Sequence, residues 1–177
     1  MNRILKNAIA AGIASVALLG ATTASAAVEM FLKMDGIKGS SKDSRHKDEI
    51  EILSFGWEVA PRSGDLVGRT TKVCAHDISF VKNVDIASPL LVSNAVGGTI
   101  LAKAIIAVRK AGEGQQEFMT IEMNNVLISS VSHSVSASAL QLETFTLNFT
   151  QATFTIKPQR DDGSLDTPVV GMVTRTC

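Results

Sequence analysis

The chain lacks an excess of either charge. Its 177 residues carry 17 lysines and arginines against 17 aspartates and glutamates, so the formal net charge is zero. Binding to a nucleic acid requires clustered cations that displace the counterions of the phosphate backbone. We therefore expect no nucleic-acid partner, and the length of the chain indicates a single folded domain.

The sequence also lacks the usual arrangements of catalytic and metal-ligating residues. Its three histidines, His46, His76 and His133, stand at no metal-ligand spacing from one another, and neither cysteine has a close Cys or His partner. The nucleophile motif Gly-x-Ser-x-Gly and the glycine-rich nucleotide fingerprints are missing. We therefore expect no enzyme activity, no cofactor and no bound metal.

An acidic cluster over residues 43–51 does not change that expectation. Its carboxylates lack the spacing of a calcium-binding loop and are interrupted by Arg45 and Lys47. Interspersed charges of both signs are typical of a solvated face. We expect this segment to be such a face.

Cysteine is scarce, with only Cys74 and Cys177 in the chain. In an oxidising compartment the two can pair, and closing a loop of about 100 residues is worth ~4–5 kcal/mol in the chain-entropy description. The alternative is two unrelated thiols. The sequence by itself leaves both open.

The N-terminal segment has the order of parts found in a secretory signal peptide. Arg3 and Lys6 precede an uncharged run of 13 residues, 8–20, and small residues follow at Ala24 and Ala26. We predict residues 1–26 to be a signal peptide that is cleaved after Ala26. The alternative is an uncleaved membrane anchor, for which the apolar run is short.

The rest of the chain, residues 27–177, is predicted to be mainly β because its dominant period is two. Apolar side chains alternate along residues 53–59, and again at Phe145, Leu147 and Phe149. The phase then flips to Phe154 and Ile156, which predicts a bulge or sharp bend near Gln151 and Ala152. Further strands are expected at residues 28–34, 75–81, 100–110, 116–128 and 131–137.

One short helix is expected at about Ser88–Gly97. Ser88 is a suitable N-cap, Pro89 fits the first helical position, and Gly98 allows the left-handed conformation that ends a helix. A long polar loop is expected at residues 61–72. Structureless loops of this length in a compact domain are usually functional.

Five stretches, in order, resemble the haemolysin-coregulated protein (Hcp) family, whose members form the inner tube of the type VI secretion system. They are MFLKMDGIKG at residues 30–39, EILSFGW at 51–57, FVKNVDIASPLL at 80–91, AIIAVRKAGEGQQEF at 104–118 and FTLNFTQATFTIK at 145–157. No single stretch is decisive, but five in the same order make a chance match improbable.

The resemblance implies a compact β-barrel of two sheets with one short helix and a long extended loop. It implies six-membered rings of identical protomers that stack into a secreted hollow tube. The implied partners are other copies of the chain, a spike protein at the tube tip, a contractile sheath, and small effector proteins carried in the lumen. The family is not catalytic by itself.

The resemblance also places the polar loop. Residues 61–72 correspond to the extended loop of the family, which reaches the neighbouring ring. The residues expected to make these stacking contacts are Pro61, Arg62, Asp65, Arg69 and Lys72. The alternative is a loop whose charges only keep it soluble.

Two features depart from the family pattern. Ordinary tube proteins are made in the cytoplasm without a cleavable signal, whereas this chain begins with one and carries a cysteine at position 177. Two functions therefore stay open. One is a secreted tube component. The other is a separately exported Hcp-fold binding protein, acting in the periplasm or outside the cell without building a tube.

Overall fold

The computed structural model describes residues 27–61, 73–112, 114–137 and 141–175. The helix is α1 (Ser88–Gly97), and the strands are β1 (Val28–Met34), β2 (Ile50–Ile52), β3 (Ser54–Gly56), β4 (Val59–Pro61), β5 (Val73–Ala75), β6 (Ile78–Asn83), β7 (Ile100–Lys110), β8 (Glu117–Ser134), β9 (Leu142–Asn148), β10 (Gln151–Ile156) and β11 (Val169–Thr174). Within these ranges, no helix combines the length and the apolar character needed to cross a bilayer.

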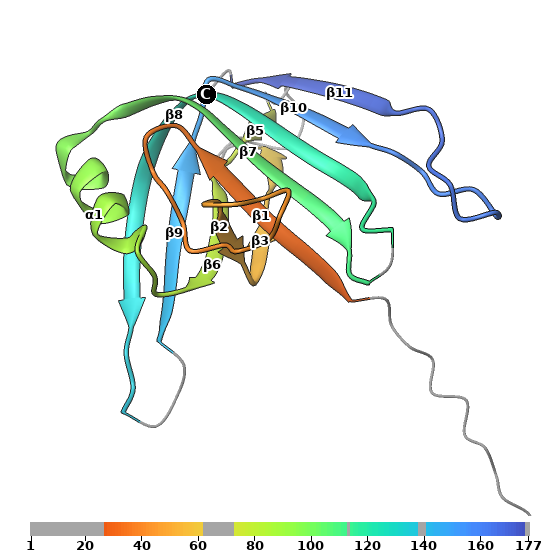
Figure 1. Cartoon of the computed structure of the whole chain (residues 1–177). Coiled ribbons are helices and arrows are strands. Elements are labelled where there is room, and N and C mark those ends of the chain that lie inside the picture. The colour runs from red at the N-terminus through yellow and green to blue at the C-terminus, as the bar shows by residue number, and fades with distance from the viewer. Residues whose placement is uncertain (1–26, 62–72, 113, 138–140, 176–177) are drawn as a thin grey trace, which may run out of the picture.

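Nine strands form one curved antiparallel sheet, and β4 and β5 form a separate two-stranded sheet. The main path runs β2-β1-β7-β8-β9-β6-β3, and β10 and β11 extend from β8 (Figure 1). The two edge strands of this path, β2 and β3, are consecutive in the chain and are joined by Leu53. The sheet therefore curls until its edges meet at a single residue.

The predicted mainly β fold with two sheets and one helix is confirmed, but the barrel is not closed. Among the described residues, no ladder of hydrogen bonds joins β2 to β3. The physical reason is that the two strands follow one another along the chain and cannot also lie side by side. Strands 28–34 and 100–110 are confirmed with their predicted bounds.

Other strand bounds differ from the predictions. The strand expected at 75–81 is divided into β5 and β6, and the two expected at 116–128 and 131–137 are one 18-residue strand, β8. β11 was not expected. Its sequence, VVGMVT, is rich in β-branched residues, and that is a signal which could have identified it.

The hydrophobic core lies inside the curl and beneath α1. Phe80 on β6 pairs across the sheet with Phe145 on β9, and the next strand places Val131 beside Phe145. The Phe80 and Phe145 rings stack with centroids 5.2 Å apart, and both side chains are fully buried. Leu91 of α1 is also fully buried, while the rest of this short helix depends on packing against β8.

The start of α1 differs from the prediction in its chemistry. The N-cap residue is Ala87, which makes no side-chain cap, and Ser88 and Pro89 are the first two helical residues. The Ser88 hydroxyl instead accepts hydrogen bonds from the Asp85 amide and from the Lys82 ammonium, each at 3.1 Å. The helix ends as expected, with Gly98 in the left-handed conformation at φ +60°.

A buried charge cluster lies under the helix. Lys82 on β6, Glu143 on β9 and His133 on β8 are cross-strand neighbours in one row. The Lys82 Nζ lies 3.2 Å from Glu143 Oε1 and 2.7 Å from Asp85 Oδ1, and the His133 Nε2 lies 2.5 Å from Glu143 Oε2. Lys82 and Glu143 are fully buried, so each of these charges is stable only because the other is present.

The predicted change of phase is confirmed, and it occurs in two strands at once. In β8 the buried side chains stand at odd positions up to Met123 (Ile121, Met123) and at even positions from Val126 on (Val126, Ile128). In the segment that pairs with β8, the buried positions are odd up to Phe149, just beyond β9, and become even at Ala152 in β10. The bend in that partner lies between β9 and β10, just before the predicted position.

Asn125 and Thr150 form this corner of the sheet. Asn125 has a φ of +50°, in the left-handed region, and its Nδ2 donates to Thr150 Oγ1 at 3.0 Å. The Thr150 amide and hydroxyl both donate to the Asn124 carbonyl at 3.1 Å. Asparagine tolerates this backbone conformation better than most side chains do.

A second cluster fixes the segment between β1 and β2. Arg109 on β7 is 2% exposed, donates to both carboxylate oxygens of Asp43 at 3.0 and 2.5 Å, and donates from Nε to Glu29 at 2.7 Å. The hydrogen bonds from Arg109 hold the pKa of Asp43 well below its usual range. The Arg109 guanidinium lies 4.8 Å from the centroid of the Phe31 ring.

The same cluster includes His46. Its ring stacks on Phe31 with centroids 4.3 Å apart, and its Nδ1 lies 2.8 Å from Glu49 Oε2. The expectation of a solvated acidic face over residues 43–51 is therefore wrong for Asp43 and Glu49. These carboxylates turn inward because Arg109 and His46 are buried beside them.

We predict that Asn125→Val destabilises the fold by about 1–3 kcal/mol, because a β-branched residue is strained at positive φ. Asn125→Gly is the matched control. Both variants lose the hydrogen bond to Thr150, but glycine adopts this φ freely, so its loss should be smaller. Urea unfolding measures both, and equal losses would show that the backbone conformation at the corner is not the constraint.

We predict that Lys82→Met costs about 3–5 kcal/mol of unfolding free energy, because it leaves two carboxylates under α1 without their cation. Adding Glu143→Leu should recover part of that loss. The control is Lys38→Met: the Lys38 side chain is 79% exposed and its Nζ lies 3.4 Å from Asp48 Oδ2. An exposed pair is worth about 0–1 kcal/mol. A loss as small as the control's would contradict the role assigned to Lys82.

Candidate self-assembly surfaces

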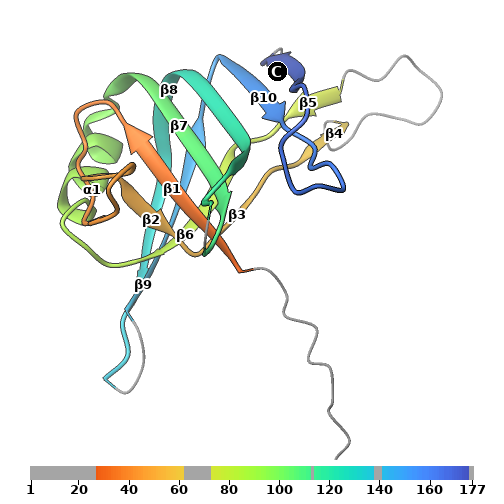
Figure 2. The same ribbon diagram turned by 45° about the vertical axis from the view of Figure 1, so that its right-hand side comes forward.

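The predicted stacking loop is carried by the β4–β5 hairpin. Val59 pairs with Ala75, and Pro61, the last residue of β4, pairs with Val73, the first residue of β5. Figure 2 shows this hairpin extending away from the main sheet. Of the residues expected to make stacking contacts, Pro61 lies at the root of the loop. The other four lie outside the described residues: Arg62, Asp65, Arg69 and Lys72.

The root of this hairpin is anchored to the corner of the main sheet. Trp57 packs edge-on against Phe149 with ring centroids 5.9 Å apart, and its Nε1 donates to the His76 carbonyl at 3.1 Å. The His76 amide donates in turn to the Glu58 carbonyl at 2.9 Å. The direction of the hairpin is therefore set by the bend next to Phe149.

Cys74 is buried in β5. Cys177 lies outside the described residues, as does Ala26 at the predicted cleavage position. Two residues before Cys177, Arg175 donates from Nη1 to Asp77 at 2.5 Å and from its amide to the Thr150 carbonyl at 2.9 Å. The described end of the chain therefore runs beside the segment that follows Cys74.

The first exposed apolar surface belongs to the β10–β11 hairpin. β10 pairs with β8, and β11 pairs with β10 and with no other strand in the described part of the chain, so β11 is an edge strand of the sheet. Val169, Val170 and Met172 of β11 are 66%, 58% and 65% exposed. An open strand edge with apolar side chains is a template for contact with another chain.

The second exposed apolar surface is formed by α1 and the residues next to it. No residue of α1 is charged, and Val96 near its end is 87% exposed. Ile86 before the helix and Ile100 after it are 65% and 68% exposed. A hollow of about 340 Å³ lies beside the helix, lined by Val92, Ala95, Val96, Val131 and His133.

The two apolar surfaces lie at opposite ends of the molecule. Figures 1 and 2 both place α1 at one side and the β10–β11 hairpin at the other. Sequence reasoning missed both, because apolar periodicity does not tell which strands and faces remain uncovered. Patches of this kind on a folded domain are typical of interaction sites.

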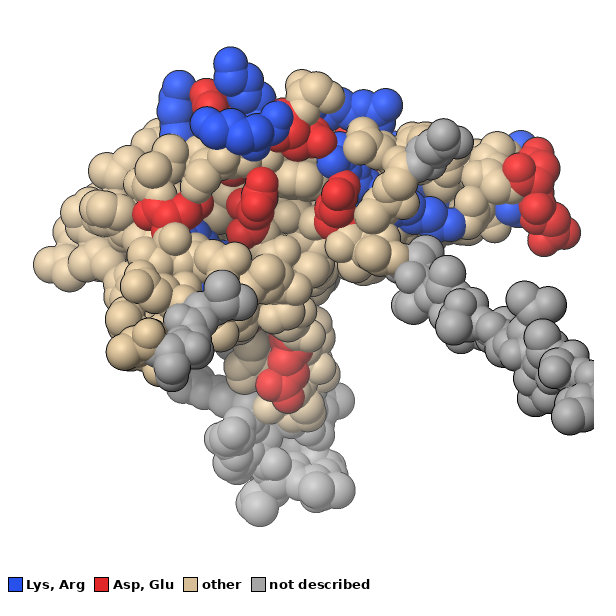
Figure 3. All heavy atoms as spheres, turned by 60° about the horizontal axis from the view of Figure 1, so that its bottom comes forward, with Lys and Arg blue, Asp and Glu red and all other residues tan. Residues whose placement is uncertain are grey.

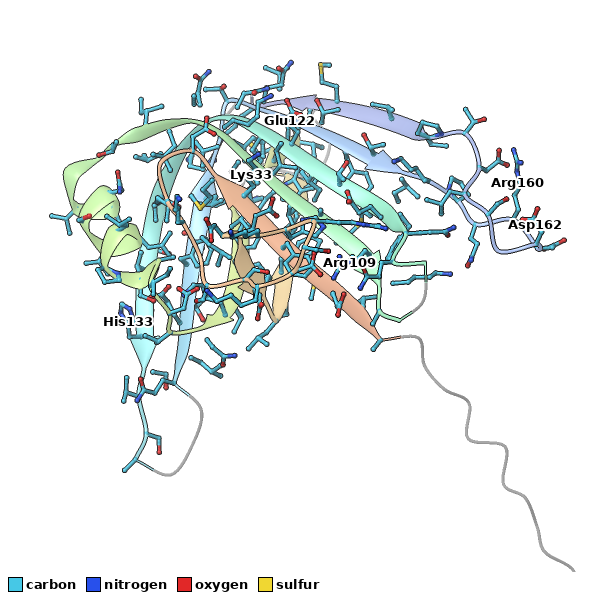
Figure 4. All side chains as sticks on the ribbon, in the orientation of Figure 1. Lys33, Arg109, Glu122, His133, Arg160 and Asp162 are labelled. Carbon is cyan, nitrogen blue, oxygen red and sulfur yellow. The ribbon has the colours of Figure 1, made fainter. Side chains whose placement is uncertain are left out.

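The three histidines have structural partners or positions rather than a shared centre. His46 stacks on Phe31, and His76 lies at the hairpin root. His133, labelled in Figure 4, is part-exposed and pairs with the buried Glu143. Within the described ranges, no group of three or more His, Cys, Asp or Glu is placed to hold a metal ion.

The family described as "Type VI secretion system effector, Hcp" matches residues 31–156. Protein hcp1 of Pseudomonas aeruginosa is 38% identical over 145 residues, which cover 79% of this chain and 90% of that protein.

Solved structures give the same result. The crystal structure of Hcp1 from Salmonella typhimurium superposes with a TM-score of 0.72 at 29% identity, covering 84% of this chain and 95% of that one. A type VI secretion system effector from Yersinia pestis superposes with a TM-score of 0.67 at 29% identity, covering 82% and 98%. Sequence and fold therefore agree over most of the chain, and the protein belongs to the Hcp family of type VI secretion system proteins.

Proposed function

We propose that this protein is a structural component of the type VI secretion system whose copies associate into six-membered rings that stack into a secreted tube. Proteins of the Hcp family form tube assemblies of this system. The observation that carries the proposal is the pair of different apolar surfaces at opposite ends of the domain. Two different surfaces that bind each other join copies head to tail, and a suitable rotation closes them into a ring.

The edge strand β11 and the surface around α1 are the proposed contact partners within the ring. β11 offers Val170 and Met172, which are two residues apart and therefore lie on the same side of the strand. The α1 surface offers Val96 and Ile100. Each surface excludes water when it meets the other, and burial of apolar area is the main driving force of such contacts.

Stacking between rings is assigned to the loop at residues 61–72. Its support is the anchored β4–β5 hairpin, which holds Pro61 and Val73 together at the root. The remaining proposed partners are the spike protein at the tube tip, the contractile sheath and small effector proteins in the lumen. The Hcp family is one of structural, secreted proteins, and we propose no enzyme activity for this chain.

A second candidate function is a separately exported Hcp-fold binding protein. It is favoured by the signal-like N-terminal segment, with processing after Ala26, and by the placement of Arg175 against Asp77, close to Cys74. We propose that Cys74 and Cys177 form a disulfide in the exported protein. Export through the periplasm would separate the chain from a tube that is assembled in the cytoplasm.

We predict that Val170→Asp together with Met172→Asp abolishes ring formation, because two carboxylates on β11 would have to be buried in the contact. Native mass spectrometry should show six-fold assemblies for the unchanged protein and monomers for the variant. Val28→Asp, at a 47% exposed valine on β1, is the control and should still assemble. Because β11 is exposed, the melting temperature of the double variant should stay within a few degrees of the parent.

The starting residue of the assembly separates the two candidate functions. A six-fold assembly that begins at Met1 supports the ordinary tube component. A processed monomer that begins at Ala27 supports the exported binding protein. Rings that survive the double variant unchanged would refute the assignment of β11 to the ring contact.

We predict that protein recovered after export has no free thiol, and that Cys177→Ser lowers its stability by as much as ~4–5 kcal/mol. Alkylation followed by non-reducing mass spectrometry counts the thiols, and thermal unfolding with and without reductant measures the stability. Cys177→Ser leaves the buried Cys74 in place, so it isolates the bond from the packing of β5. Two alkylated cysteines per chain would exclude the intramolecular bridge.

A further inference from the structure

Exposed cations gather at the end of β1 and on the segment between β1 and β2, where Asp35 is exposed but two other acids point into the fold. The five exposed cations are Lys33, Lys38, Lys42, Arg45 and Lys47. Asp43 and Glu49 of the same segment are held by Arg109 and His46 inside the fold. Figure 3 shows the resulting group of Lys and Arg side chains at one edge of the view.

Several of these cations surround a hollow, which we call the basic hollow. It has a volume of about 530 Å³. Its lining includes four cations, Lys33, Lys38, Arg45 and Lys47, and three acids, Asp35, Asp48 and Glu49. Lys38 lies 3.4 Å from Asp48, which also lines the hollow. Within the described part of the chain, Lys33, Arg45 and Lys47 form no ion pair. The Arg45 guanidinium donates to the carbonyl of Gln115 at 3.0 Å, which fixes its position without neutralising it.

The opposite charge is found on the turn between β10 and β11, residues 157–168, which we call the acidic turn. Asp161 and Asp162 are both exposed at its tip. Arg160 beside them forms an ion pair with Asp166 at 2.7 Å, so neither tip carboxylate has an ion-pair partner among the described residues. Figure 4 shows Arg160 and Asp162 at the outer end of this turn.

The acidic turn has a defined shape. Asp162 Oδ1 accepts hydrogen bonds from the Ser164 amide at 2.9 Å and from its hydroxyl at 2.6 Å, and Gly163 provides the positive φ of +85°. These hydrogen bonds from Ser164 hold the pKa of Asp162 below its usual value. The turn therefore presents a fixed negative charge that persists at mildly acidic pH.

We propose that the acidic turn of one copy docks into the basic hollow of the next copy in the ring. Figure 3 shows a group of Lys and Arg side chains on one side of the molecule and a group of Asp and Glu side chains at the opposite end, so one chain does not bring its own acidic turn to its own basic hollow. The contact is head to tail, and it rests on the proposed assembly of copies into rings. It adds to the apolar contact a set of charges that selects the orientation of the incoming copy.

Charges at the rim of an interface act mainly on association rate and specificity. Complementary fields raise association rates by roughly 10- to 1,000-fold, and salt screens this effect over a Debye length of about 8–10 Å. The docking proposed here should therefore govern how fast and in which register rings form. It should weaken as the salt concentration rises.

Charge reversal in the full chain tests the proposal. Asp161→Lys with Asp162→Lys, or Lys33→Glu with Lys47→Glu, should each slow ring formation by about tenfold or more at low salt, as followed by light scattering. Combining all four substitutions should restore the rate, because each surface again meets its opposite. The control, Glu51→Lys with Glu58→Lys, changes the net charge by as much as the two aspartate substitutions do. Because it does so at other exposed positions, it should have little effect on the rate.

Each outcome bears on the proposal. Rescue by the four-fold variant supports docking between copies, and it also shows that the reversed chains fold. Slowing in both double variants without rescue overturns it, as does an unchanged rate in either of them. If Lys33→Glu with Lys47→Glu slows ring formation and the two aspartate substitutions do not, the hollow binds a different polyanion, and this result also overturns the proposal. If the unchanged protein forms no rings, the proposed function itself fails; if it forms rings at a rate insensitive to these substitutions, only this inference fails.

Discussion

The bend shared by β8 and its partner strands fixes where the core, the helix and the β10–β11 hairpin lie. β8 pairs with β7 along one edge, while β9 and then β10 follow its other edge. Asn125, at φ +50°, and Thr150 turn both strands at the same point. On one side of the bend the sheet curls around the core and carries α1. On the other side it extends as the β10–β11 hairpin, so the bend sets the separation of the two apolar surfaces.

Two buried cations organise the charges of the fold. Lys82 gathers Glu143 and Asp85 beneath the helix, and Arg109 gathers Asp43 and Glu29 beside Phe31. A buried cation is stable only with such partners. Because Asp43 and Glu49 point into the fold, the exposed cations on and after β1 outnumber the exposed acids beside them. A chain with no net charge can in this way present a basic face at one place and an acidic turn at another.

The assembly proposed for the protein follows from what the fold leaves uncovered. The sheet covers its own core but exposes β11 as an edge strand and α1 as an uncharged helix. Membership of the Hcp family agrees with this arrangement, because proteins of that family form tube assemblies. The charged hollow and turn would orient copies that the apolar surfaces hold together.

The sequence by itself determined the mainly β character, the bounds of α1, the strands at 28–34 and 100–110, and the change of phase after Phe149. These are local properties, since side chains alternate along any half-buried strand and glycine ends a helix wherever it occurs. Three other features could be seen only in the folded chain: the barrel stays open at Leu53, Ser88 binds Lys82 rather than capping the helix, and Asp43 turns inward to Arg109. Each of these depends on groups far apart in the chain, whose distances no local pattern encodes. The two apolar surfaces, the basic hollow and the acidic turn could not be predicted from local patterns either. Whether a residue is exposed or covered is fixed only when the whole sheet has curled.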